Sequence, residues 1–216
     1  MSTLKILVEG PDDDAVCFHL LKQHGIEPLT IEKLEGYSKL LEGIHTRIHA
    51  QSDLEALAIV VDADLDLKSR WAELSHKIQT AGYKTCPEEP DSQGTIIMEP
   101  NKPLVGIWIM PDNTTAGLLE HFVTALIPKG DPLWPRAQQC VDQIPHEQRP
   151  FKEASLPKAK IHTWLAWQSE PGSKMGGAIA RKYLDPNAPA AALFMAWIRR
   201  MLDQKQAFQS EPNILG

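Results

Sequence analysis

The fold is decided by Leu4-Lys5-Ile6-Leu7-Val8-Glu9-Gly10-Pro11-Asp12-Asp13-Asp14, an apolar run that ends in a carboxylate, a Gly-Pro pair and three aspartates. The run 4–8 is short, contains branched residues and precedes Gly-Pro, which is typical of a buried strand. Proline suits the first turn of a helix, and acidic residues suit its N-terminus electrostatically. We therefore expect a helix over residues 13–24. Glu9 should lie at the carboxyl tip of the first strand, where open α/β sheets bind ligands.

Apolar strands and amphipathic helices continue to alternate along the chain. Further strands are expected at residues 28–34, 56–61, 95–98 and 105–110, and helices around 40–48, 71–78 and 115–126. This order is typical of an α/β fold with a mostly parallel central sheet and helices on both faces. Later helices are expected at 134–143, 161–167, 176–183 and 190–202. We therefore predict an α/β domain, 1–127, and a mostly helical C-terminal extension, 128–216, packed on it.

Size and composition indicate a globular protein with a sizeable core. The 216 residues are 43% hydrophobic and carry a net charge of −6. This charge excludes a protein that binds DNA or membranes through its overall charge, although a local basic patch is still compatible with it. No secretion signal and no run long enough to span a bilayer is present, so we expect a cytoplasmic protein without a membrane partner.

Acidic residues follow three of the expected strands. Glu9 follows the first, Asp62 and Asp64 follow the third, and Asp112 follows the strand that ends at residue 110. In a parallel sheet these strand tips share one edge, and Asp62 and Asp64 point the same way while the chain stays extended. Carboxylates gathered in this way raise one another's pKa unless a cation is present, and Mg²⁺ prefers carboxylate oxygens.

Helix capping is the alternative explanation for several of these acids. Asp12, Asp13, Asp14, Asp66 and Asp112 could each cap a helix and do nothing more. Capping does not account for Glu9, which precedes a glycine at the end of an apolar strand. It also does not require Asp62 and Asp64 together.

Two short motifs resemble those of a known family. Val8-Glu9-Gly10-Pro11-Asp12-Asp13 resembles the E-G-x-x-D signature of Toprim domains, and Asp62-Ala63-Asp64 resembles their D-x-D signature. Pro111-Asp112-Asn113, with Gly117 and Glu120, is similar to a later element of stand-alone bacterial Toprim-like proteins related to OLD-type nucleases. The segment Lys158–Leu202 is also similar to the tail of that group. The resemblance implies a Toprim-like α/β fold.

The resemblance also implies a chemistry and a set of roles. It implies a nuclease or phosphotransferase that acts on nucleic-acid phosphodiesters and depends on Mg²⁺ or Mn²⁺. Glu9 would be the general acid/base or a metal ligand, while Asp62 and Asp64 would hold the ion. Asp13 stands where OLD-type members often have another metal-binding acid. Further candidate ligands, for a second metal, are Asp66, Asp112 and Glu120. Such ions polarise the phosphoryl oxygen and stabilise the developing charge.

Several related enzymes are excluded by motifs that this sequence lacks. The chain contains no P-loop of the form G-x-x-x-x-G-K-[ST], no primase zinc motif and no topoisomerase tyrosine context. It is therefore expected to be neither a topoisomerase nor a primase, and it lacks the motor half of a full OLD protein.

Basic residues are concentrated in the last third of the chain, at Lys152, Lys158, Lys160, Lys174, Arg181 and Lys182. A phosphate-bearing substrate that approaches an acidic site needs cations nearby. Lys158 and Lys160 are therefore added to the candidate catalytic residues. The expected partner is nucleic acid, either DNA or RNA, and a protein partner is compatible with the sequence.

Two other functions fit the same acids. A non-catalytic Toprim-like module would use this edge to bind nucleic acid or a protein. A phospho-acceptor receiver domain would also carry acids after its first strand and an aspartate after its third. That fold requires a Ser or Thr and a Lys at two later strand ends, where this chain has Met98-Glu99-Pro100 and Met110-Pro111-Asp112. Metal-dependent cleavage separates an enzyme from a binding module.

Overall fold

A five-stranded sheet forms the centre of the computed structural model, which describes residues 3–26, 29–50 and 54–210. The strand order is β2-β1-β3-β5-β4, with bounds Thr3–Val8 (β1), Thr30–Lys33 (β2), Leu54–Asp62 (β3), Thr95–Ile97 (β4) and Leu104–Met110 (β5). β4 is antiparallel to β5, and all other neighbours are parallel. The predicted mostly parallel α/β sheet is confirmed. The strand expected at 28–34 is shorter, and residue 28 lies outside the described residues.

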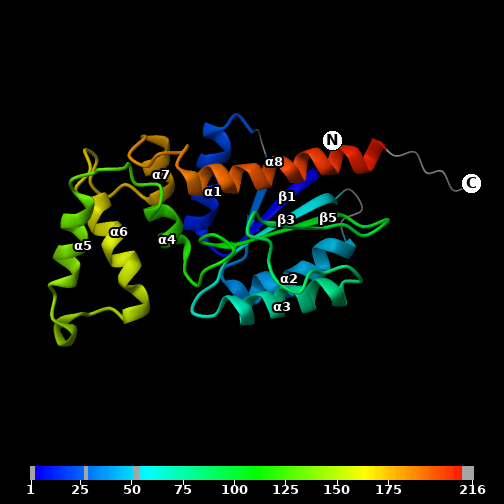
Figure 1. The fold of residues 1–216 in the computed structure, drawn as a ribbon, viewed down its shortest axis with the longest axis horizontal. Coiled ribbons are helices and arrows are strands. Elements are labelled where there is room, and N and C mark those ends of the chain that lie inside the picture. The colour runs from blue at the N-terminus through cyan, green and yellow to red at the C-terminus, as the bar shows by residue number, and fades with distance from the viewer. Residues whose placement is uncertain (1–2, 27–28, 51–53, 211–216) are drawn as a thin grey trace, which may run out of the picture.

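Helices cover both faces of the sheet (Figure 1). One face carries α1 (Pro11–Gln23) and α8 (Pro189–Ser210), and the other carries α2 (Tyr37–Ala50) and α3 (Leu67–Thr80). Side chains alternate between these layers, so Val60 packs toward the first pair, while Ile59 and Val61 pack toward the second. Because both faces are buried, β3 and β5 are apolar along almost their whole length.

The C-terminal half of the chain is helical, as predicted. Its helices α4 (Leu119–Thr124), α5 (Trp134–Asp142) and α6 (Leu156–Ala166) lie beyond the carboxyl ends of the parallel strands (Figure 1). α7 (Met175–Ala180) and α8 join the same apolar core as α1. α8 continues past its predicted end at residue 202. The division between residues 127 and 128 stays a prediction, and residues 1–2 and 211–216 lie outside the described residues.

Close packing of α7 against α1 depends on one glycine. A Cβ on Gly176 would lie 2.6 Å from the carbonyl carbon and oxygen of Ala15, whereas a Cβ on Gly177 would meet only the Arg181 side chain, at 3.0 Å. Because Ala15 follows the acidic first turn of α1, this contact fixes where that turn lies.

Substitution of these neighbouring glycines should have opposite effects. Gly176→Ala is expected to lower the free energy of unfolding by about 1–3 kcal/mol, because backbone must move to admit the methyl group. Gly177→Ala should raise it by up to about 1 kcal/mol, because alanine favours the helix more than glycine does. Urea unfolding of both variants measures the difference. Equal shifts of the same sign would contradict the close approach.

Candidate acidic site at the carboxyl edge of the sheet

The candidate site lies where β1 and β3 end side by side. The helices that follow these two strands, α1 and α3, leave toward opposite faces of the sheet. In open α/β sheets this divergence opens a crevice at the carboxyl ends of the strands, which is the usual ligand site. The structure places Glu9 directly after β1 and Asp62 at the last position of β3.

Hydrogen bonds from the backbone hold both of these carboxylates. The Asp62 N–H donates to Glu9 Oε1 at 2.9 Å, and the Leu119 N–H donates to Asp62 Oδ1 at 2.7 Å. The two carboxylates thereby join the ends of β1 and β3 to the first residue of α4. These bonds use one oxygen of each carboxylate and leave the second for another ligand.

Asp13 joins this pair from the first turn of α1. Its Oδ2 accepts the Gly10 N–H at 3.1 Å, so it serves as a helix cap. Its Oδ1 is buried and has no hydrogen-bond partner, and the residue as a whole is only 8% exposed. A buried carboxylate oxygen without a partner is costly. Capping therefore accounts for Asp13 Oδ2 but not for Asp13 Oδ1.

Glu120 contributes a fourth acid, from α4, and it lies beside a lysine. The residue is 7% exposed. Lys158 Nζ from α6 lies 3.6 Å from Glu120 Oε1 and 4.0 Å from Asp12 Oδ2. The Lys158 side chain is half-exposed, so a cation stands at the rim of the acidic cluster. We use the name acidic cluster for Glu9, Asp13, Asp62 and Glu120.

Members of the acidic cluster perturb one another electrostatically. Burial raises the pKa of Asp62 to about 8, with further contributions from the charges of Asp13, Glu9 and Glu120. Burial and the Glu9 charge raise the pKa of Asp13 to about 7. Burial also raises the pKa of Glu9. At neutral pH the cluster therefore tends to retain protons unless a cation replaces them.

Asp64 is turned away from its expected position. Its φ of 53° is left-handed, so the chain is no longer extended there, and the prediction that Asp62 and Asp64 point the same way is wrong. The Asp64 N–H donates to the Gly117 carbonyl at 2.9 Å, and its carboxylate forms an ion pair with Arg70. Asp64 remains close enough for its charge to raise the pKa of Glu9.

Two further sequence candidates have partners outside the acidic cluster. Asp66 caps α3, because its Oδ1 accepts the N–H groups of Lys68 and Ser69 at 3.0 and 3.1 Å. Lys160 Nζ lies 2.8 Å from Oδ1 of Asp142 on α5, so the two side chains form an ion pair. These contacts account for both side chains structurally.

Asp112 organises a turn. Its Oδ1 accepts the N–H groups of Thr114 and Thr115 at 2.9 and 2.8 Å. Burial acts to raise the pKa of Asp112, but hydrogen bonds from both threonines outweigh that effect and lower the pKa. This turn also explains why the helix predicted over 115–126 begins only at Leu119.

The donor chemistry of the acidic cluster fits a hard divalent cation. All its ligating atoms are carboxylate oxygens, which Mg²⁺ and Mn²⁺ accept, and one of them is the orphaned Asp13 Oδ1. Within residues 3–26, 29–50 and 54–210, however, no three His, Cys, Asp or Glu side chains are already arranged to hold a metal ion. Binding of an ion would therefore require these side chains to rotate toward it.

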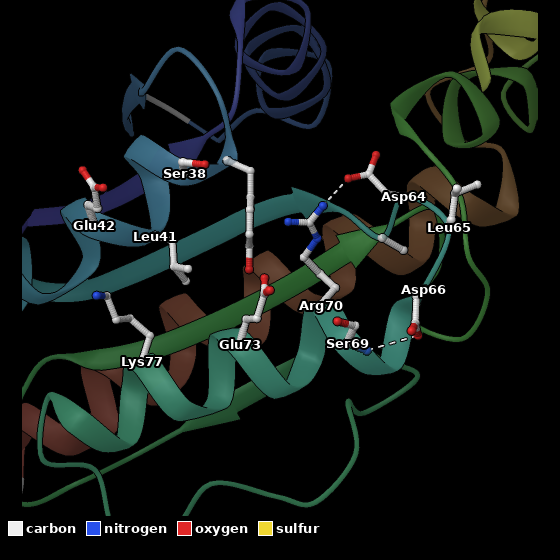
Figure 2. Close-up of a pocket in the computed structure, with 12 residues that line it drawn as sticks. Ser38, Leu41, Glu42, Asp64, Leu65, Asp66, Ser69, Arg70, Glu73 and Lys77 are labelled. Carbon is white, nitrogen blue, oxygen red and sulfur yellow. Dashed lines mark hydrogen bonds and ion pairs between the residues drawn. The ribbon is translucent and has the colours of Figure 1, made fainter. Parts of the chain in front are cut away.

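An open pocket of about 520 Å³ adjoins the site on the α2–α3 face. Figure 2 shows Arg70 reaching from α3 toward Asp64 at the β3 tip, with Ser38 on the opposite wall. Sequence reasoning missed Arg70. Its position in the sequence could have indicated it, because the side chain of an arginine in the first turn of the helix after the D-x-D motif can reach back to the end of the preceding strand.

Comparison with known proteins gives one family match. The family described as "Protein of unknown function (DUF3226)" matches residues 3–203. No curated protein and no solved structure matches the chain. The matched range includes every member of the acidic cluster and Lys158. Within the described residues no helix is both long and apolar enough to cross a membrane, and a cytoplasmic location stays a prediction.

Proposed function

The chain belongs to the DUF3226 family, and we propose that it is a Mg²⁺- or Mn²⁺-dependent enzyme that cleaves or transfers nucleic-acid phosphodiesters. The observation that carries the proposal is the convergence of four carboxyls: Glu9 directly after β1, Asp13 on α1, Asp62 at the end of β3 and Glu120 on α4. Charge coupling among four buried or half-buried carboxyls has a high energetic cost, which a divalent cation would remove. The resemblance to the E-G-x-x-D and D-x-D motifs of Toprim domains supports the same proposal.

The acidic cluster can divide the chemistry between two roles. Asp13, Asp62 and Glu120 are the candidate ligands, because each is a buried or half-buried carboxyl whose charge is part of the same coupled group. Once bound, the ion would polarise a phosphoryl oxygen and offset the charge of the carboxylates. Glu9 is held by the Asp62 N–H, and its raised pKa favours the protonated form that a general acid needs.

Lys158 is proposed as the phosphate-attracting residue at the rim. It is half-exposed, and its Nζ lies 3.6 and 4.0 Å from its two acidic neighbours, which leaves it able to contact a ligand. A cation at this position offsets the repulsion between the acidic cluster and a polyanionic strand.

Lys158→Ala is expected to lower kcat/KM for oligonucleotide cleavage about tenfold, mainly through KM, because one phosphate contact is lost. Lys160→Ala is the matched comparison, since it removes the same charge from the same helix but its partner is Asp142. That variant should change kcat/KM less than about twofold. Equal losses in both variants would show that general positive charge matters and not the position of Lys158.

The experiment that tests the function uses the purified full chain with plasmid DNA and with single-stranded DNA and RNA. We expect cleavage in Mg²⁺ or Mn²⁺ and none in EDTA. If the protein binds a nucleic acid but cuts none of these substrates with any divalent metal, the enzyme proposal fails and the binding-module alternative replaces it.

A further inference from the structure

Arg70 is a mostly buried cation whose partner is exposed. Its side chain is 10% exposed, and its guanidinium carbon lies 3.4 Å from the centre of the Tyr37 ring, which fixes its orientation. It forms an ion pair with Asp64, whose side chain is 55% exposed (Figure 2). A ligand that competes for Arg70 would therefore have to displace only a solvated carboxylate.

Asp64 is held in an uncommon backbone conformation while it makes this contact. Its left-handed φ of 53° is disfavoured for a residue with a side chain, although aspartate tolerates it better than most. An ion pair with one exposed partner contributes little to stability. Breaking the Asp64–Arg70 contact therefore costs little free energy. The Asp64 carboxylate would then be free beside the acidic cluster.

Arg70 also has room for a ligand beside it. It lines the pocket of about 520 Å³ between α2 and α3, together with the side chains of Ser38 and Ser69. A guanidinium can donate several hydrogen bonds to phosphate oxygens. Arg70 comes from α3 and lies close enough to Glu9 for their charges to interact, whereas Lys158 comes from α6 and lies 3.6 Å from Glu120, so each cation adjoins a different member of the acidic cluster.

We propose that Arg70 binds a backbone phosphate of the nucleic-acid strand and that Asp64 occupies the guanidinium until that phosphate displaces it. Carboxylate and phosphate are interchangeable partners for the planar guanidinium group, so the ion pair within the protein imitates the ligand contact. The strand then crosses the acidic cluster from Lys158 to Arg70. This inference rests on the proposed function and names the second cation of the same site.

Binding measured in EDTA tests the inference without cleavage. Fluorescence anisotropy with labelled single-stranded DNA and RNA oligonucleotides gives the Kd of each variant. Arg70→Ala is expected to weaken binding about tenfold, and Asp64→Asn to strengthen it about tenfold, because the competing carboxylate is removed. Asp66→Asn is the matched control, since it removes the same charge from the same loop but caps α3 instead of pairing with Arg70. It should change Kd about twofold at most.

A double-mutant cycle separates competition from general electrostatics. In the Arg70→Ala background, Asp64→Asn should no longer improve binding beyond the effect of Asp66→Asn. Arg70→Lys, which keeps the charge but loses the planar fork, should give an intermediate Kd. Circular dichroism confirms that each variant is folded.

Two results with Asp64→Asn would overturn the phosphate contact at Arg70. One is an Asp64→Asn variant with a lower unfolding temperature and no improvement in binding. The other is a failure of both Asp64→Asn and wild type to bind any oligonucleotide in EDTA. If the protein cleaves nucleic acid but Arg70→Ala leaves Kd unchanged, the proposed function stands and only the phosphate contact at Arg70 is rejected. If the Kd values change as predicted but no substrate is cleaved, the phosphate contact is supported and the proposed enzymatic activity is rejected.

Discussion

Glu9→Gln is expected to lower the cleavage rate by about 10²- to 10⁴-fold, the usual contribution of a general acid or base. The glutamine amide oxygen can still accept the Asp62 N–H, so the contact between the β1 and β3 tips is retained. The substitution removes only the ability to carry a proton or a negative charge. Rates should be measured under single-turnover conditions in Mg²⁺ and in Mn²⁺.

Glu89→Gln is a suitable control for Glu9→Gln. Glu89 is an exposed carboxylate outside the acidic cluster, so this variant should cleave at the wild-type rate. Thermal unfolding should show that both variants remain folded. Retention of more than about a tenth of the wild-type rate by Glu9→Gln would contradict a role for Glu9 in proton transfer or metal binding.

Asp62→Asn should remove much of the pH dependence of stability. The folded pKa values of Asp62 and Asp13 are about 8 and about 7, whereas both carboxyls titrate near 3.8 in the unfolded chain. Between these limits the folded protein binds more protons than the unfolded one. The free energy of unfolding of the metal-free wild type therefore falls as pH rises from about 4 to about 8.

Asparagine cannot ionise, so the variant avoids this loss. Asp62→Asn is expected to be about 2 kcal/mol more stable than wild type at pH 8 in EDTA and to differ little at pH 5. The full shift would correspond to roughly 6 kcal/mol, but the coupled neighbours can hold the proton in place of Asp62. The amide oxygen can keep the bond from the Leu119 N–H.

Urea unfolding at pH 5 and pH 8, with EDTA or with Mg²⁺, measures this effect. Mg²⁺ at pH 8 should stabilise wild type and should not stabilise Asp62→Asn. Asp66→Asn keeps its cap and lies outside the acidic cluster, so it should follow the wild-type pH dependence. A wild-type protein whose stability rises from pH 5 to pH 8 in EDTA would show that the carboxyls are not coupled as described.

Strand ends were the part of the site that sequence could predict. The residues directly before Glu9 and Asp62, 6–8 and 56–61, are continuously apolar because helices bury both faces of these strands. A carboxylate directly after such a run has to lie at the sheet edge, whatever the loops do. Asp13 was a candidate only through the resemblance to OLD-type proteins, and the structure places it in the first turn of the helix that starts at Pro11.

Side-chain partners in the loops could not be predicted in the same way. Asp64 was expected beside Asp62, but a single left-handed residue redirected it, and its bridge to Gly117 is a tertiary contact. Asp112 was treated as a candidate ligand, although hydrogen bonds from Thr114 and Thr115 use its carboxylate locally. Short polar residues often form such turns, and the sequence does not show which of them will.

Helical geometry separates the two lysines, but the helix was expected to begin only at residue 161, whereas α6 begins at Leu156. Residues two apart on a helix do not share a face, so Lys158 and Lys160 could not both reach the acidic cluster. The structure turns Lys158 toward Glu120 and Lys160 toward Asp142. Which of the two faces the site depends on how α6 packs, and that packing is set by contacts from distant parts of the chain.

Direct observation of the cation is the most direct test of the account. Crystals of the full chain should be soaked in Mn²⁺, and data should be collected near the manganese absorption edge. We predict an anomalous peak bounded by Asp13, Asp62 and Glu120 and adjacent to Glu9, with the three ligand carboxylates rotated toward it. A well-ordered acidic cluster without such a peak at saturating Mn²⁺, or a peak only at unrelated surface acids, would contradict the account.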